Sequence, residues 1–410
     1  MSTNAQSPAI TIPLLLLLAT ILLIARRPDQ FLDPYVWVED SHAIRDFLNH
    51  GLLSIFVPVQ GYIVLPTKII NIVSTLISFY YYPEVSYTLT IIFTLSVIVA
   101  IAFSPTELRW RWLCAVLTLL IPTDPEAFGV SLMAFWWGGI LAILALLWNR
   151  SGKWRGLQVA YVVFGGFSAP VIVGLTPLFW LRALLERRRA DALVAGLATG
   201  VAVVQTILVL GHPSTATSNP LKIADVFVFM EKYFGYFTVY SFADWPYTLA
   251  AAVVMLGLLA YGCWIALFRR EFYFLIAVLT IFALAGLSSL RQTPAITHPI
   301  LAGPRYYFYP YIVLSWALVW MIVLAKPPIK PVIMAAIALA LANATGHFAR
   351  YHQHLDWRAH LDRCLRNEEP GTQRIPIHFA GLTAQPADLW FIDLTRQECE
   401  RLVGRGLIGP

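Results

Sequence analysis

Two acidic pairs have the residue types and the spacing to do chemistry. Glu39 and Asp40 are adjacent in an aromatic stretch that follows the first apolar run, and Asp124 and Glu126 are two residues apart in a short loop. Neighbouring carboxylates can supply a general base, a metal ligand, or both. The alternative is that they cap the helices that follow them. We therefore take all four as candidate catalytic residues, and Asp40 and Asp124 also as candidate ligands for a divalent cation, Mg²⁺ or Mn²⁺.

A second candidate set could hold a phosphate on a lipid. Arg305 lies in the stretch Gly303-Pro304-Arg305-Tyr306-Tyr307, where a guanidinium could clamp a phosphate through two parallel hydrogen bonds. Lys68 and Arg291 are further candidates for this phosphate. The alternative is a belt of interfacial aromatic rings with a snorkelling arginine. The aromatic side chains expected to contact lipid or sugar are Tyr35, Trp37, Tyr306 and Tyr307.

These residues belong to a strongly apolar chain. Of its 410 residues, 58% are hydrophobic and 13% are charged, whereas soluble domains carry about 25% charged residues. A soluble protein of this length would need more polar residues to cover its surface. Intrinsic disorder and coiled coils are excluded by the same composition. The composition therefore predicts a polytopic membrane protein.

The apolar runs predict an all-α membrane domain over residues 1–348 with about eleven transmembrane segments, several of them short. The first run has no small-residue cleavage site after it, so we expect it to remain as the first span. The predicted segments are residues 9–25, 86–104, 112–121, 129–148, 157–167, 170–185, 190–210, 246–268, 272–290, 307–324 and 331–347.

The distribution of Lys and Arg predicts the orientation of these segments. One set of loops holds 13 Lys and Arg in 33 residues and the opposite set holds 8 in 117 residues, so the first set is expected to be cytoplasmic. The N-terminus is then cytoplasmic and the C-terminal tail lies outside. The net charge of +6 is therefore a topology signal, and we expect no nucleic-acid partner. The loops expected to be cytoplasmic are 105–111, 149–156, 182–191, 269–271 and 326–330. The loops expected to lie outside are 26–85, 122–128, 211–245 and 291–305.

Two stretches complicate this count of spans. Residues 59–80 are apolar but contain Lys68, and a span there would invert everything that follows. We expect them instead to form a helix along the outer surface, within the outer loop 26–85. Residues 157–185 contain the break Gly165–Pro170, which predicts two half-length segments that meet there. Because broken helices at membrane depth must be buried in protein or line a cavity, this break is a cavity candidate.

The tail, residues 349–410, is predicted to form a small mixed α/β domain. Residues 350–366 are compatible with a helix, 374–379 and 389–392 with strands, and Thr395 and Glu398 have capping-box spacing for a last helix. Cys364 and Cys399 are the only cysteines in the tail, and a disulfide between them would stabilise it by roughly 4 kcal/mol. Four histidines lie between residues 347 and 360, but without partners at zinc spacing interfacial or packing roles are favoured: His347, His352, His354 and His360.

The arrangement resembles the GT-C superfamily of integral membrane glycosyltransferases, in particular bacterial members that use polyprenyl-phosphate sugars. The resemblance rests on residues 27–40, 122–128, 165–170 and 303–310. It implies that Glu39 or Asp40 acts as a base or a metal ligand. It also implies an undecaprenyl-type polyprenyl-phosphate sugar donor, a lipid-linked or glycan acceptor such as O-antigen, and contact with membrane lipids. The location implied is the bacterial inner membrane, with the tail in the periplasm. A strict Asp-x-Asp motif is missing.

The function expected is therefore transfer of a sugar by a single, inverting displacement. A carboxylate takes the proton of an acceptor hydroxyl, and the leaving polyprenyl phosphate needs only charge stabilisation by Arg305, Lys68 or a divalent cation. Two other classes stay open: a lipid-linked saccharide flippase or transporter, and a polysaccharide-assembly membrane protein. An acyl or phosphoethanolamine transferase would need a Ser, Thr or His nucleophile, and the sequence shows none in a convincing setting.

Overall fold

The structure is a computed structural model that describes most of the chain. The described residues are 11–59, 61–149, 154–212, 222–269, 272–289, 304–348, 354–368, 371–378 and 389–409. Arg291 and His352 lie outside these ranges, and Arg305 lies inside a helix without a described side chain.

Each of the eleven predicted segments contains a helix in the structure. Five of these helices are long and apolar enough to cross a membrane: α5, α10, α13, α14 and α15. The chain is accordingly a mostly helical, multi-pass integral membrane protein. The helices are α1 (Ile12–Arg26), α5 (Tyr82–Phe103), α6 (Arg111–Leu119), α7 (Ala134–Leu146), α8 (Arg155–Gly166), α9 (Val171–Glu186), α10 (Arg189–Gly211), α13 (Tyr247–Arg269), α14 (Phe272–Ser289), α15 (Pro304–Leu324) and α16 (Lys330–Thr345).

Shorter elements fill the segments predicted to lie on the outer side. The structure has α4 where a surface helix was expected, and its 13 residues span about 20 Å, which is less than the hydrocarbon core of a bilayer. The shorter elements are α2 (Pro28–Leu32), α3 (Asp40–His50), η1 (Gly51–Phe56), α4 (Leu65–Ile77), η2 (Pro125–Ala127), α11 (Ile223–Met230), η3 (Glu231–Gly235) and α12 (Tyr236–Val239).

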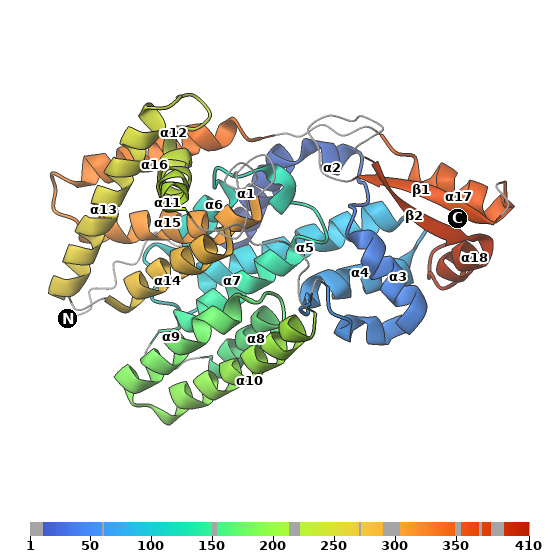
Figure 1. The fold of residues 1–410 in the computed structure, drawn as a ribbon, viewed down its shortest axis with the longest axis horizontal. Coiled ribbons are helices and arrows are strands. Elements are labelled where there is room, and N and C mark those ends of the chain that lie inside the picture. Colours follow the sequence, from blue (N-terminus) through green and yellow to red (C-terminus); the bar gives the residue numbers. More distant parts are fainter. Residues whose placement is uncertain are drawn as a thin grey trace.

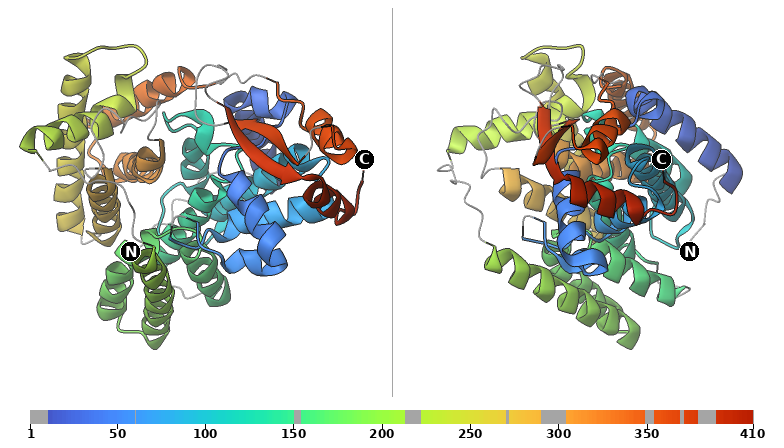
Figure 2. Two further views of the ribbon diagram at one scale, coloured as in Figure 1. Left: turned by 45° about the vertical axis from the view of Figure 1, so that its right-hand side comes forward. Right: turned by 90° about the vertical axis from the view of Figure 1, so that its right-hand side faces the viewer.

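Helix α7 forms the centre of the membrane domain, because every one of its residues is buried. Two glycines allow its close packing: a Cβ on Gly138 would lie 2.2 Å from Ser168 Oγ, and a Cβ on Gly139 would lie 2.0 Å from Tyr309 Oη. Around this centre, α8, α9 and α10 project together away from α13 and α16 (Figures 1 and 2).

The predicted break between two half-length segments is confirmed: α8 ends at Gly166 and α9 begins at Val171. The break itself does not line an open space. A Cβ on Gly165 would lie 2.5 Å from the backbone nitrogen of Ala142, and Ser168 and Ala169 are buried. The turn is thus packed against α7, and its backbone is accommodated by burial in protein. The interpretation of this hairpin as a cavity is therefore wrong.

The C-terminal tail folds as α17 (Trp357–Arg366), β1 (Thr372–His378), β2 (Leu389–Thr395) and α18 (Arg396–Gly404). The two strands are antiparallel, with Ile375 opposite Ile392. A disulfide joins Cys364 to Cys399. The expected capping box starts α18, where the Thr395 side chain accepts a hydrogen bond from the Glu398 backbone N–H. The predicted helix, strands and cap are thus present, although α17 begins later than expected.

The tail shares its hydrophobic core with residues 26–85, the segment predicted above to be the first outer loop. Val36, Ile44 and Phe47 belong to the same buried cluster as Trp357 and Ile375. Polar contacts reinforce this packing. The backbone N–H of His378 donates to the carbonyl of Val36 at 3.1 Å, and Arg45 pairs with Glu398 at 2.5 Å. The tail, α3 and α4 therefore gather at one end of the molecule, and the turn between α9 and α10 lies at the other (Figure 1).

Candidate functional site

A fully buried arginine at the end of α1 binds the loop that carries Asp124 and Glu126, predicted above to be the second outer loop (residues 122–128). Arg26 is 0% exposed. Its guanidinium donates to the carbonyls of Ile121 at 2.8 Å and Thr123 at 2.7 Å, and it lies 4.2 Å from the centre of the Phe128 ring. The fork of donors on arginine suits this double contact. Residues 121–128 are thus fixed directly beside the start of the first outer loop.

The next residue extends this attachment. Arg27 donates to both carboxylate oxygens of Asp29, at 3.0 and 3.1 Å, and to the Tyr35 hydroxyl. It also donates to the carbonyls of Pro125 at 3.0 Å and Phe128 at 3.1 Å. One side chain thereby joins the first outer loop to the second. We call these five residues the Arg27 network.

The second acidic pair serves this attachment. Asp124 is 1% exposed, and its Oδ1 accepts a hydrogen bond from the Glu126 backbone N–H at 2.7 Å, at the start of η2. It also interacts electrostatically with Arg26 and Arg27. Helix capping and charge balance, the alternative to a catalytic role, therefore account for the place of Asp124.

The first acidic pair lies where the two outer loops meet. Asp40 is 2% exposed. Its Oδ1 accepts a hydrogen bond from the Ser131 hydroxyl at 2.6 Å, and its Oδ2 accepts one from the Trp37 backbone N–H at 3.2 Å. Burial raises the pKa of the Asp40 carboxyl to about 6, although the hydrogen bond from Ser131 opposes this shift. Both oxygens of Asp40 are thus engaged with protein, whereas the neighbouring Glu39 is half-buried.

The cations expected to hold a phosphate fall into different settings. Lys68 is 1% exposed and forms an ion pair with Asp46 of α3, so its charge is already compensated. Arg305 occupies the first turn of α15, and Arg291 lies outside the described residues. Of the three, Arg305 stays our candidate for the phosphate.

The aromatic residues expected to contact lipid or sugar are mostly core residues. Tyr35, Trp37 and Tyr307 are buried, at 8%, 2% and 0% exposure, whereas Tyr306 is half-buried. Tyr35 packs edge-on against His378 of the tail, with 4.4 Å between ring centres. Burial in the fold explains these three aromatic side chains, and an open lipid surface does not.

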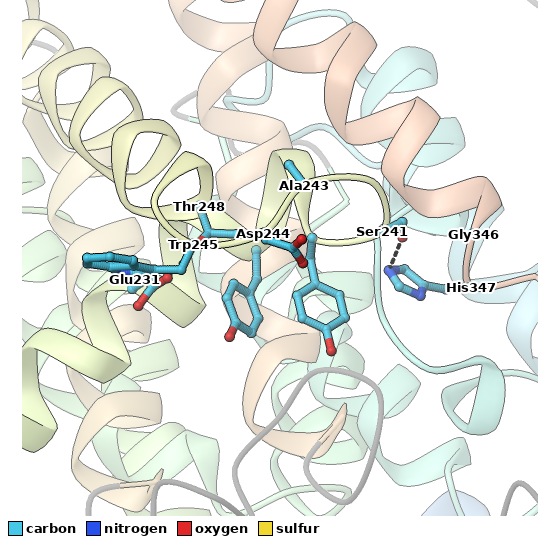
Figure 3. Close-up of a pocket in the computed structure, with 10 residues that line it drawn as sticks. Glu231, Ser241, Ala243, Asp244, Trp245, Thr248, Gly346 and His347 are labelled. Atoms are coloured by element: carbon cyan, nitrogen blue, oxygen red, sulfur yellow. Dashed lines mark hydrogen bonds between the residues drawn. The ribbon is translucent and has the colours of Figure 1, made fainter.

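A cavity of about 460 Å³ lies between the segment η3–α12, the start of α13 and the end of α16. Its size falls in the range of small-molecule sites, roughly 300–1,000 Å³. Figure 3 shows Glu231 and Trp245 at one end, Ser241 and His347 at the other, and Asp244 between them. Its lining residues are Glu231, Tyr236, Tyr240, Ser241, Ala243, Asp244, Trp245, Thr248, Gly346 and His347.

Ser241 and His347 lie close enough to be compared with a nucleophile and its base. Ser241 Oγ is 2.8 Å from His347 Nε2, and the same hydroxyl donates to the carbonyl of Asn343 at 2.9 Å. The Asn343 side chain accepts a hydrogen bond from the Ser241 backbone N–H at 2.7 Å. Since the hydroxyl proton is directed to a carbonyl, the imidazole N–H is the donor to Ser241. The pair therefore fastens the α12–α13 turn to α16.

The cavity is connected to the acidic loops through one residue. Phe348 follows His347, and its ring centre lies 4.9 Å from the Arg26 guanidinium. In the sequence, Arg26 and Arg27 stand out only as loop charges and His347 only as an interfacial or packing residue, so this connection could not be predicted. Their one sequence signal is an arginine pair directly between an apolar helix and an acidic loop.

Comparison of the chain with protein-family models, curated proteins and solved structures yields no match. The resemblance to the GT-C superfamily is therefore a proposal. It rests on the sequence motifs named above.

Within the described residues, no three His, Cys, Asp or Glu side chains are grouped so that they could hold a metal ion. In particular, Asp40 and Asp124 are each engaged by protein hydrogen bonds. The expected Mg²⁺ or Mn²⁺ thus finds no group of three protein ligands among the described residues, and we derive no step through a metal.

Proposed function

We propose that this protein is an integral membrane glycosyltransferase that moves a sugar from a polyprenyl-phosphate donor to a lipid-linked or surface-glycan acceptor. One observation carries the proposal: Glu39 and Asp40 stand at the start of α3 beside the contact between the two loops, with Asp40 fixed at 2.6 Å to Ser131, which lies between the second loop and α7. A carboxylate held in this way at one end of a membrane domain is suited to chemistry on a lipid-linked substrate.

The contacts divide the roles of the two carboxylates. Both oxygens of Asp40 accept hydrogen bonds from protein, so Asp40 is a positioning residue that fixes the start of α3. Glu39 is the adjacent, half-buried carboxylate and is the proposed base. A general base must reach the proton that it removes, and a partly accessible side chain meets this condition better than a buried one.

The proposed reaction is a single displacement that balances without a cofactor. Glu39 takes the proton from an acceptor hydroxyl while the hydroxyl oxygen bonds to the anomeric carbon of the donor sugar. The bond from that carbon to the phosphate oxygen breaks, and polyprenyl phosphate leaves as an anion that needs no proton. Arg305, at the first turn of α15, is proposed to balance this charge.

The test compares three variants of the full-length protein in membrane vesicles supplied with radiolabelled polyprenyl-phosphate sugars. Glu39→Gln is expected to lower the rate of sugar transfer about 10²- to 10⁴-fold, the usual effect of losing a general base. Asp40→Asn should lower it less, since only positioning is affected. The control is Glu400→Gln, the same chemical change on a half-exposed side chain of the tail, which should leave transfer unchanged.

If Glu39→Gln is correctly inserted and still transfers sugar at the wild-type rate, Glu39 is not the base. The function itself is tested separately, by the masses of surface glycans after deletion of the gene. Loss of one hexose or deoxyhexose per repeat supports glycosyl transfer. Loss of whole glycan chains supports a flippase or an assembly protein, and unchanged masses refute the proposal.

A further inference from the structure

The charge of the cavity between α12, α13 and α16 limits what it can bind. Glu231 and Asp244 line it, and among the residues that the structure describes its lining contains no lysine or arginine. A phosphate or carboxylate entering this space would meet these two carboxylates and no lysine or arginine of the described lining. An anionic ligand is therefore disfavoured, and so is the phosphate of a polyprenyl-phosphate sugar.

The cavity combines aromatic faces with hydrogen-bonding groups. The ring centres of Tyr236 and Tyr240 are 4.4 Å apart, and Trp245 is 68% exposed beside them. Carboxylates and hydroxyls of Glu231, Asp244, Ser241 and Thr248 complete the lining. A pyranose has the matching surface, because it carries hydroxyl donors around its edge and apolar C–H groups on its faces.

The walls are held in place before any ligand arrives. The Asn343 side chain accepts from the Ser241 backbone at 2.7 Å and donates to the carbonyls of Tyr236 at 2.7 Å and Phe237 at 3.1 Å. A Cβ on Gly346 would lie 2.6 Å from Ser241 Oγ, so only glycine allows α16 to approach this turn so closely. A preformed wall lowers the ordering cost of binding.

We propose that this cavity is a binding site for an uncharged pyranose, namely the sugar of the glycan acceptor. The assignment to the acceptor rests on the proposed function, whereas the sugar site stands on the lining alone. Asp244 and Glu231 accept hydrogen bonds from the sugar hydroxyls, and Trp245 packs against a face of the ring.

Binding is measured directly, without any transfer reaction, by ligand-observed saturation-transfer NMR. The full-length protein is held in a lipid nanodisc, because alkyl-glycoside detergents would compete for the site. The probes are neutral methyl pyranosides and disaccharides, tetramethylammonium, and inorganic phosphate. Wild-type protein is expected to bind at least one neutral glycoside and not phosphate. Asp244→Asn and Trp245→Ala should each weaken this binding at least tenfold.

Two control variants test whether any loss is local. Trp264→Ala removes a half-exposed tryptophan of α13 that stacks on Tyr261, away from the cavity, and should bind the glycoside like wild type. Glu39→Gln should also bind like wild type, although it is expected to slow transfer about 10²- to 10⁴-fold. If the wild-type protein binds the glycoside but transfers no sugar, the cavity remains a sugar site and its assignment to the acceptor is wrong.

Three results would overturn the proposal. One is binding of no neutral glycoside by the wild-type protein. Another is glycoside binding that survives both cavity substitutions. The last is binding of tetramethylammonium alone with dependence on Trp245, which would assign the cavity to a cation held by aromatic faces and carboxylates.

Discussion

Replacing Arg27 by methionine should strongly destabilise the folded protein. Arg27 and Asp29 form an ion pair whose side chains are 1% and 7% exposed, and the guanidinium makes five hydrogen bonds in the Arg27 network. Methionine is an unbranched side chain that replaces the apolar stem of arginine but carries no hydrogen-bond donor. Removing one partner of a buried ion pair costs about 3–5 kcal/mol, because the other charge is left uncompensated. We expect a loss of this size in the free energy of unfolding.

Two further variants separate charge from packing. Arg366→Met removes an arginine whose pair with Glu368 is 65% and 43% exposed, and such surface pairs contribute about 0–1 kcal/mol. The double variant Arg27→Met with Asp29→Asn removes both buried charges, so it should recover part of the stability lost in the single variant.

The free energies come from SDS titration of the purified protein in mixed micelles, followed by circular dichroism. The expected order of stability is wild type, then Arg366→Met close to it, then the double variant, then Arg27→Met. If Arg27→Met has the same free energy of unfolding as Arg366→Met, the Arg27 network does not hold the two loops together. If the double variant is as unstable as the single one, the loss does not come from an uncompensated carboxylate.

Two other predictions concern pH and redox state. The pKa of Asp40 is about 6 in the folded protein, above the value of 3.8 for an unperturbed aspartate, so its contribution to stability is complete below pH 3.8 and is lost as pH rises through 6. Relative to Asp40→Asn, the free energy of unfolding of wild type should fall by on the order of 3 kcal/mol between pH 4 and pH 8 in the same SDS titration. A difference between the two proteins that does not change with pH would contradict this. Reducing the Cys364–Cys399 disulfide should destabilise the tail by up to about 4 kcal/mol, seen as faster proteolysis, and the double Cys→Ser variant should show the same rate with or without reductant.

The helices could be predicted from the sequence because the apolar runs are bounded by charged or Pro- and Gly-containing loops, and the longer runs are the most distinct. Helices α5 and α13 match their predicted segments to within a few residues. Short elements such as α6, with nine residues, agree in position but are too short for composition to decide whether they cross the bilayer.

The candidate site could be predicted only in part. The sequence places Glu39, Asp40, Asp124 and Glu126 on one face, and the structure brings their loops together. It does not predict that Asp40 bonds to Ser131, 91 residues away, since such a contact depends on how α3 packs on the second loop. The cavity could not be predicted from the sequence for the same reason, because two of its lining residues, Ser241 and His347, are 106 residues apart.

The contact between His378 and Val36 affects how the protein is made. The segment that carries Glu39 emerges among the first residues of the chain, but β1, which hydrogen-bonds to it, is synthesised more than 300 residues later. Pairing across such a distance closes late in folding. The start of α3 therefore reaches its final support only after the whole membrane domain has been inserted, so that a nascent chain stopped before the tail lacks a finished first loop.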